Sequence, residues 1–146
     1  MGAGTFRASR EERWVAESVY PPAAPGFAEL RRRPGRSSAP ELAVLSASGR
    51  LDPAHPALEH GVLVLTTSGG EAALRSRLPS ASTVVSLGPS IDLHDALAVL
   101  RARGHRLLLS EGGPTLAGSL AGADLIDELF LTVAPVLAGR GGGRRV

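Results

Sequence analysis

The chain has 146 residues, 43% of them hydrophobic, which suits one domain, residues 1–146, with a single packed core. Because it contains no cysteine, disulfides, thiolate metal sites and a cysteine nucleophile are excluded. The net charge is only +2 and aromatic residues make up 3%, so a nucleic-acid-binding face of basic and aromatic side chains is not expected. The sequence shows neither a signal peptide nor a run of 18 apolar residues, and we expect a cytoplasmic protein without a membrane partner.

The segment 9–41 differs in composition from the rest of the chain. Prolines break any long periodic pattern here, and three consecutive arginines add charge. We therefore expect a loop-rich surface connection with at most a short helix around Phe27 to Arg33. The prolines are Pro21, Pro22, Pro25, Pro34 and Pro40.

Regular structure is expected from Leu42 onward, where short apolar runs indicate strands. Several of these runs are continuously apolar, which is typical of strands that are buried on both faces of a sheet. The predicted strands are Leu42–Leu45, Val62–Leu65, Thr83–Leu87, Leu107–Leu109 and Leu129–Val133.

Helix signals lie between the predicted strands. Ser68 and Glu71 have the spacing of a capping box, which predicts a short helix to about Arg77. Asp92 is a candidate cap for a second helix ending at Gly104. Pro114 suits the first turn of a third helix. Alternating strands and helices predict an α/β fold with substantial parallel pairing, which binds ligands at the carboxyl ends of its strands.

The segment LLLSEGGPTLAGSL, residues 107–120, is the sharpest local signal for a site. Gly112 and Gly113 permit a tight turn and close approach of a ligand, and the helix that follows presents free N–H groups to an anion. Glu111 places a carboxylate at the strand end, where it can accept hydrogen bonds from a ligand. The pattern is equally consistent with a plain strand-to-helix turn and a solvated glutamate.

Other parts of the sequence argue against several other kinds of binding or catalytic site. The opening G-A-G-T fails as a dinucleotide fingerprint because Arg7 stands at the third glycine position and no strand precedes it. The chain has no lysine, so it lacks the phosphate-binding loop of nucleotide hydrolases, and a hydrolase nucleophile motif is absent too. The four histidines are not at metal-ligand spacings, and we expect no metal site.

Three segments in order resemble a known family. Residues 2–8 (GAGTFRA), 42–53 (LAVLSASGRLDP) and 110–141 are similar to the riboflavin-pathway pyrimidine reductase domain of the dihydrofolate-reductase-like superfamily. The third segment contains E-G-G-P-T-L, D-E-L and P-x-L-x-G. The resemblance implies a three-layer α/β/α fold with a mixed, mostly parallel sheet. It also implies an NADPH-dependent oxidoreductase that reduces a diaminopyrimidine ribosylamino phosphate, the substrate of 5-amino-6-(5-phosphoribosylamino)uracil reductase.

The resemblance also implies roles for individual residues. Glu111 would face the substrate or the nicotinamide, as the candidate catalytic residue. The turn and the helix after it would line the NADPH pyrophosphate, and residues at other strand ends would add contacts. The implied cofactor-binding residues are Gly4, Thr5, Ser46, Thr66, Gly112, Gly113, Pro114, Thr115, Leu116, Ala117, Gly118 and Ser119.

The chain also departs from the family pattern. Ser9 and Arg10 stand where relatives usually carry an acidic residue. Relatives also have a strand and a helix before G-A-G-T and two closing strands after P-x-L-x-G, and we expect the domain to lack both. This leaves two alternatives to the reductase of riboflavin biosynthesis: a non-catalytic, truncated remnant that binds a dinucleotide, or a dihydrofolate or pterin reductase. Family members tend to pair, so a homodimer is expected.

Overall fold

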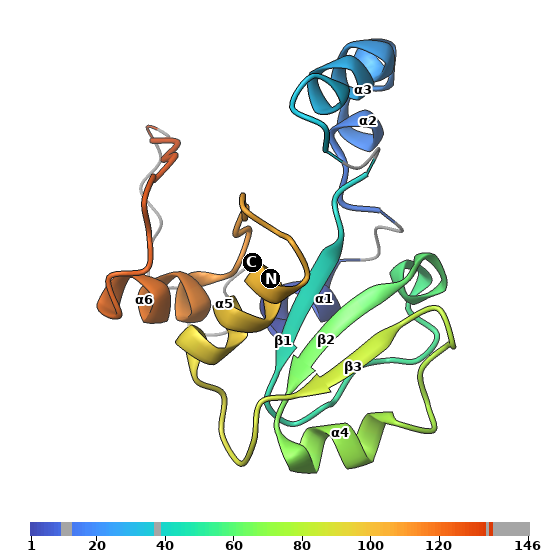
Figure 1. Ribbon diagram of the computed structural model, residues 1–146, viewed down its shortest axis with the longest axis vertical. Coiled ribbons are helices and arrows are strands. Elements are labelled where there is room, and N and C mark those ends of the chain that lie inside the picture. The colour runs from blue at the N-terminus through green and yellow to red at the C-terminus, as the bar shows by residue number, and fades with distance from the viewer. Residues whose placement is uncertain (10–12, 37–38, 134, 136–146) are drawn as a thin grey trace.

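A parallel β-sheet forms the centre of the molecule (Figure 1), seen in a computed structural model that describes residues 1–9, 13–36, 39–133 and 135. Its strands are β1 (Leu42–Ser46), β2 (Val62–Thr66) and β3 (Thr83–Ser86), in that spatial order. The register places Leu42 opposite Val62. β2 is buried along its whole length because it is central in the sheet and covered on both faces. The three strands predicted at these positions are confirmed.

The first two residues add a short stretch of pairing to the free edge of β1. Gly2 forms an isolated parallel bridge with Leu45. The Met1 amino group donates to the Ala43 carbonyl oxygen at 2.6 Å, and the Leu45 N–H donates to the Met1 carbonyl oxygen at 2.8 Å. Residues 1 and 2 therefore lie beside the carboxyl-terminal half of β1, and the helix that follows starts next to the end of this strand.

Helices cover both faces of the sheet. On one face lie α1 (Ala3–Ala8), the 3-10 helix η2 (Pro56–His60) and α4 (Ser68–Leu74), whose apolar side chains pack on those of β1 and β2. On the other face lies α5 (Leu93–Ala102), which buries Ala96 and Leu100 against the sheet. These layers confirm the predicted three-layer α/β/α architecture.

Both ends of α5 agree with the predicted signals, whereas the start of α4 differs by one residue. Asp92 caps α5 as predicted, since its carboxylate accepts from the His94 N–H at 2.6 Å. Gly104 follows that helix with φ of 88°, a conformation that favours glycine. The predicted cap of α4 was wrong by one position: Thr67, not Ser68, accepts from the Gly70 N–H at 3.1 Å.

The segment predicted as loop-rich contains more helix than expected. It includes α2 (Ala16–Val19), the 3-10 helix η1 (Pro21–Ala23) and the nine-residue α3 (Ala24–Arg32). Pro25 lies in the first turn of α3, where its missing N–H costs no hydrogen bond, so the proline does not prevent the helix. These helices form a lobe that extends away from the sheet in Figure 1.

Two predicted strands were wrong. Leu107–Leu109 and Leu129–Val133 form no strand in the structure, and no neighbouring strand lies beside them in the described part of the chain. Their side chains face solvent, with Leu109 77% and Phe130 85% exposed. A strand requires a partner for its backbone groups, and the local sequence specifies only the preference for an extended conformation. In Figure 1 the described residues 123–133, which follow α6 (Pro114–Gly122), stand clear of the sheet.

Candidate functional site

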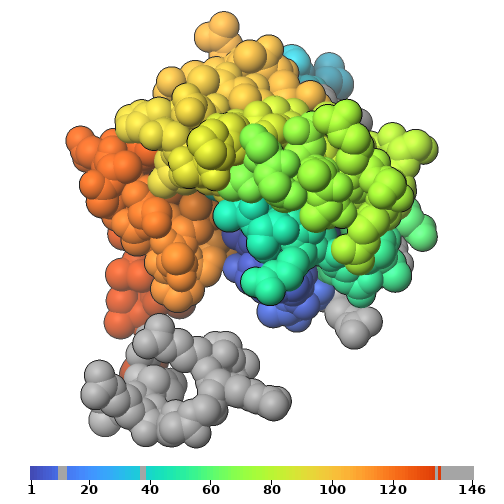
Figure 2. All heavy atoms as spheres, turned by 90° about the horizontal axis from the view of Figure 1, so that it is seen from below, coloured from blue at the N-terminus to red at the C-terminus, as the bar shows by residue number. Residues whose placement is uncertain are grey.

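The structure brings together two segments from opposite ends of the chain. The Gly113 N–H, at the start of α6, donates to the Thr5 Oγ1 of α1 at 3.1 Å across 108 positions of sequence. A Cβ added to Gly113 would lie 3.3 Å from the same oxygen, and one added to Gly2 would lie 3.9 Å from the Leu116 Cβ. The amino-terminal ends of α1 and α6 are therefore packed against each other. In Figure 2 the blue amino-terminal residues lie between the orange residues near α6 and the cyan residues that follow β1.

The start of α6 retains an exposed, uncapped backbone. Gly113 is its N-cap, Pro114 occupies the first turn, and no side chain of the described residues caps the helix. The N–H groups of the first turn, such as those of Thr115 and Leu116, have no acceptor within the helix, and the helix dipole places partial positive charge there. This end of α6 therefore favours an anionic group such as a phosphate.

Gly112 closes the turn on its inner side. A Cβ added there would lie 2.8 Å from the Leu116 Cδ2, so a larger residue would displace the leucine side chain. Gly112, Gly113 and Leu116 are partly buried, whereas Pro114 and Thr115 are exposed. The turn is thus packed on one side and open to solvent on the other.

The later predicted residues of α6 are less suited to ligand contact. Ala117, Gly118 and Ser119 are exposed and lie after the uncapped turn. The Ser119 hydroxyl donates to the Thr115 carbonyl oxygen at 2.9 Å, so this donor is used within the helix. The amides at the start of α6 are therefore better candidates for binding an anion than the hydroxyl of Ser119.

Glu111 lies in solvent near the start of the chain. Burial lowers the pKa of the Met1 amino group, and the nearby negative charge of Glu111 acts in the opposite direction. This interaction indicates that the Glu111 carboxylate lies in the neighbourhood of the Met1 amino group. Gly4, in the first turn of α1, is exposed with open space around it.

The two predicted residues at the strand ends are both buried. Thr66 is completely inaccessible, and its hydroxyl donates to the Ser46 carbonyl oxygen at 2.6 Å, which joins β1 to β2. No atom of the side chain reaches the surface, so the structure lends no support to its predicted contact with a cofactor, which stays a prediction. The Ser46 hydroxyl is also buried, and it has no hydrogen-bond partner among the described residues.

A group of hydroxyls at the carboxyl ends of β2 and β3 was not predicted as part of the site. The Thr67 hydroxyl donates to the Ala47 carbonyl oxygen at 2.7 Å, and the Ser68 and Ser86 hydroxyls are 3.3 Å apart. Gly70 lies so close to β2 that an added Cβ would be 2.0 Å from the Thr66 Oγ1. The signal in the sequence is T-T-S-G-G directly after an apolar run, the same order of apolar run, paired glycines and helix as in residues 107–120.

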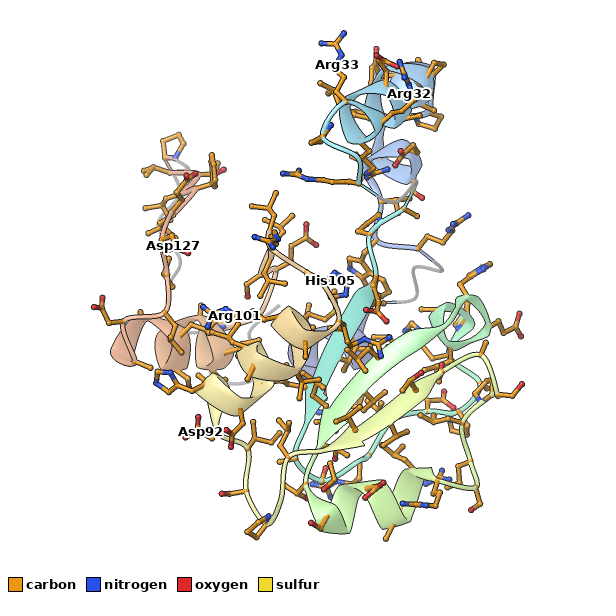
Figure 3. All side chains as sticks on the ribbon, in the orientation of Figure 1. Arg32, Arg33, Asp92, Arg101, His105 and Asp127 are labelled. Atoms are coloured by element: carbon orange, nitrogen blue, oxygen red, sulfur yellow. The ribbon has the colours of Figure 1, made fainter. Side chains whose placement is uncertain are left out.

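A separate charged cluster lies at the opposite, amino-terminal end of the strands. Glu41 lies just before β1, and both of its carboxylate oxygens accept from the Arg103 guanidinium, Oε1 at 2.5 Å and Oε2 at 3.2 Å. Its Oε2 also lies 2.5 Å from the His105 Nε2. The Arg103 hydrogen bond is the main cause that lowers the pKa of Glu41, and the same contact raises the pKa of Arg103. The cluster borders an open cavity of about 470 Å³. Figure 3 shows His105 at this end of the sheet and Asp92 at the other.

The described part of the chain holds neither a cluster of metal-ligating side chains nor a helix that could span a membrane. Within it, no three acidic or histidine side chains gather in a way that could hold a metal ion. None of the described helices has the length and apolar character needed to cross a bilayer.

The fold and the site together define an α/β domain with a candidate anion-binding turn at the start of a helix. The family model of the RibD C-terminal domain matches residues 1–146, and the chain belongs to this family of riboflavin-pathway reductases. The fold is also that of a solved pyrimidine reductase-like protein from Corynebacterium diphtheriae, with a TM-score of 0.74 and 24% sequence identity. That alignment covers 95% of this chain and 58% of the other, so the chain spans little more than half of its structural relative. No curated protein matches the sequence.

Proposed function

We propose that this domain binds NADPH and reduces a diaminopyrimidine ribosylamino phosphate, as a reductase of the riboflavin pathway. The observation that carries the proposal is the contact between Gly113 and Thr5, which joins the two family motifs at the uncapped start of α6. Family membership supplies the reaction class, and the open backbone amides supply a place for the cofactor phosphates.

The residues around this contact fit a dinucleotide. The amides of Thr115 and Leu116 would hold the pyrophosphate, with Gly113 leaving space for its approach and Thr5 fixing the turn from behind. When bound, NADPH supplies the hydride, so the protein has to orient the reactants and needs no nucleophile of its own. Glu111, exposed on the same side, is the residue that we assign to the substrate.

A non-catalytic dinucleotide-binding protein is the second candidate, and one observation favours it. Leu107–Leu109 and Glu111 are exposed, so nothing in the described residues shields the substrate side of the turn from water. A reductase pocket normally excludes water from the reacting atoms. On this alternative, NADPH binds but no pyrimidine or dihydrofolate substrate is turned over.

The test is a fluorescence titration of the chain with NADPH and with NADH, repeated on Gly113→Val. The valine side chain would crowd Thr5 and the open turn, and we expect the dissociation constant for NADPH to rise at least about tenfold, or about 1.4 kcal/mol. Gly122→Ala is the matched control, because Gly122 ends the same helix with open space around it and should leave affinity unchanged.

The outcomes separate the two candidates. Equal NADPH affinity in Gly113→Val and the unmodified chain, with both folded, would remove the assignment of the turn. If NADPH binds as expected, assays with pyrimidine and dihydrofolate substrates follow, together with Glu111→Gln. If the chain is a reductase, Glu111→Gln should lower turnover by a larger factor than it changes the affinity for NADPH. NADPH binding without turnover of either substrate supports the non-catalytic protein.

A further inference from the structure

His55 occupies an unusual position for a histidine, stacked in the core against Phe6 with Trp14 close to both rings. Its ring centroid lies 4.0 Å from that of Phe6 and 6.1 Å from that of Trp14, and the three rings are within 26° of parallel. The residue is only 7% exposed. A phenyl ring could fill such a space, so the imidazole nitrogens need an explanation of their own.

The hydrogen bonds of His55 define its protonation. Nε2 lies 3.1 Å from the Phe6 carbonyl oxygen and 2.8 Å from the Ser9 carbonyl oxygen. Carbonyl oxygens only accept, so Nε2 must carry a proton and donate to both. Nδ1 accepts from the Ala57 N–H at 3.3 Å, so it must carry a lone pair. The geometry therefore requires the neutral tautomer with the proton on Nε2.

The two carbonyls that His55 holds are at the carboxyl-terminal end of α1. The last carbonyls of a helix have no partner within it, and Phe6 is among the last four residues of α1, with Ser9 as its C-cap. With only six residues, α1 is too short to be stable alone. His55 thus caps α1 from the loop before η2, while Thr5 of the same helix holds the Gly113 N–H.

We propose that His55 is a positioning residue for the cofactor site: by capping α1 it fixes Thr5, and through Thr5 it fixes the turn at Gly113. The chain of contacts runs from Ala57 through His55 to α1, and from Thr5 to the start of α6. The inference rests on the proposed function for its effect on NADPH, but its structural part is independent of any cofactor.

Three substitutions separate this role from simple core filling. His55→Gln keeps an amide donor at the distance of Nε2, so it can still reach the carbonyls of α1. His55→Asn places its amide near the position of Nδ1 and leaves those carbonyls without a donor. His55→Phe keeps the ring stack and loses every hydrogen bond.

We expect NADPH affinity to depend on a hydrogen-bond donor at position 55 and not on an aromatic ring there. His55→Gln should bind NADPH within about threefold of the unmodified chain, and His55→Asn and His55→Phe should weaken binding about tenfold or more, about 1.4 kcal/mol. His60→Asn, an exposed histidine in the neighbouring turn, is the control and should change nothing. Equal losses of affinity in the Gln and Asn variants, or a loss that simply tracks the melting temperature, would overturn the proposal.

A second measurement needs no cofactor. Hydrogen exchange of the Gly113 amide should be faster in His55→Asn than in His55→Gln, although residue 113 is far from position 55 in sequence. In Thr5→Val, which removes the acceptor for Gly113, adding His55→Asn should cause no further acceleration. Unchanged exchange at Gly113 in His55→Asn would refute the positioning role. If exchange at Gly113 changes as expected but the chain binds no NADPH, the proposed function is refuted instead. Near-ultraviolet circular dichroism of Trp14, the single tryptophan, reports whether each variant keeps the stack.

Discussion

Thr66 shows at the scale of one residue why a hydroxyl at a strand end is not evidence of a binding site. Its position after an apolar run suggested a ligand contact, since the ends of parallel strands often hold ligands. The structure instead directs the side chain to the face covered by α1 and α4, where the hydroxyl donates to the Ser46 carbonyl oxygen. The sequence indicates which residue ends a strand, but the side that its hydroxyl faces depends on which helices cover the sheet.

Replacing Thr66 by valine should therefore affect stability rather than ligand binding. The substitution removes a buried hydrogen bond at constant volume, and the Ser46 carbonyl keeps a second donor, the Gly49 N–H at 3.2 Å. We expect the free energy of unfolding to fall by about 1 kcal/mol in urea denaturation. Thr83→Val, at an exposed position of β3, is the control and should remain within about 0.5 kcal/mol of the unmodified chain. A neutral Thr66→Val would show that this bond does not hold the strands together.

At the scale of elements, the sequence predicted the helices and strands that are marked by local signals such as caps, stops and apolar runs. The cap at Asp92, the stop at Gly104 and the proline that opens α6 are all local, and each is found as expected. The three central strands were predicted because continuous apolar runs require burial on both faces. In the lobe, the sequence predicted only a short helix around Phe27 to Arg33. The helices α2 and η1 and the first turn of α3 were not predicted, because prolines indicate breaks, although Pro25 lies in a first turn, where proline is tolerated.

Glu41 joins two elements that local signals do not relate, the start of β1 and the segment after α5. Arg103 and His105 both contact its carboxylate, and these contacts lower its pKa. A carboxyl group with a lowered pKa in the folded state stabilises that state above its ordinary pKa, near 4.5, and this contribution is lost as the pH falls below that value.

We therefore expect Glu41→Gln to be less stable than the unmodified chain at pH 7, by about 1 kcal/mol or less because the cluster is partly exposed. The difference should shrink as the pH falls from about 5 toward 3, where the unmodified carboxylate also becomes protonated. Thermal unfolding at several pH values measures it, with Glu59→Gln, an exposed side chain of η2, as the control. A difference that stays constant across this range would contradict the charge-based account.

At the scale of the whole molecule, the described residues leave a large apolar surface exposed. The side chains of Leu107, Leu109, Leu129, Phe130, Leu131 and Val133 are each at least 68% exposed. The apolar residues of the two predicted strands that did not form contribute to this surface. Their sequences favour an extended conformation, but the partner of a strand is set by the rest of the fold, so no local pattern could show that they would stay unpaired.

This exposed apolar surface predicts self-association of the chain, in line with the homodimer that the family resemblance implied. We expect sedimentation velocity to show species heavier than 15.0 kDa that increase with protein concentration. Replacing Leu129 and Leu131 by aspartate should shift the distribution toward the monomer, because both side chains are more than 70% exposed and are not needed for the core. Aspartate at Val19, an exposed position of α2, provides the comparison. A monomer at all concentrations in the unmodified chain would disprove the expectation.

The central claim, that a dinucleotide binds where the starts of α1 and α6 meet, is tested most directly by amide chemical shifts during an NADPH titration. We predict saturable shifts concentrated at Thr5, Gly113, Thr115 and Leu116, with weaker effects from NADH. Shifts confined to the cluster of Glu41, Arg103 and His105, or no shifts in a folded sample, would contradict the account.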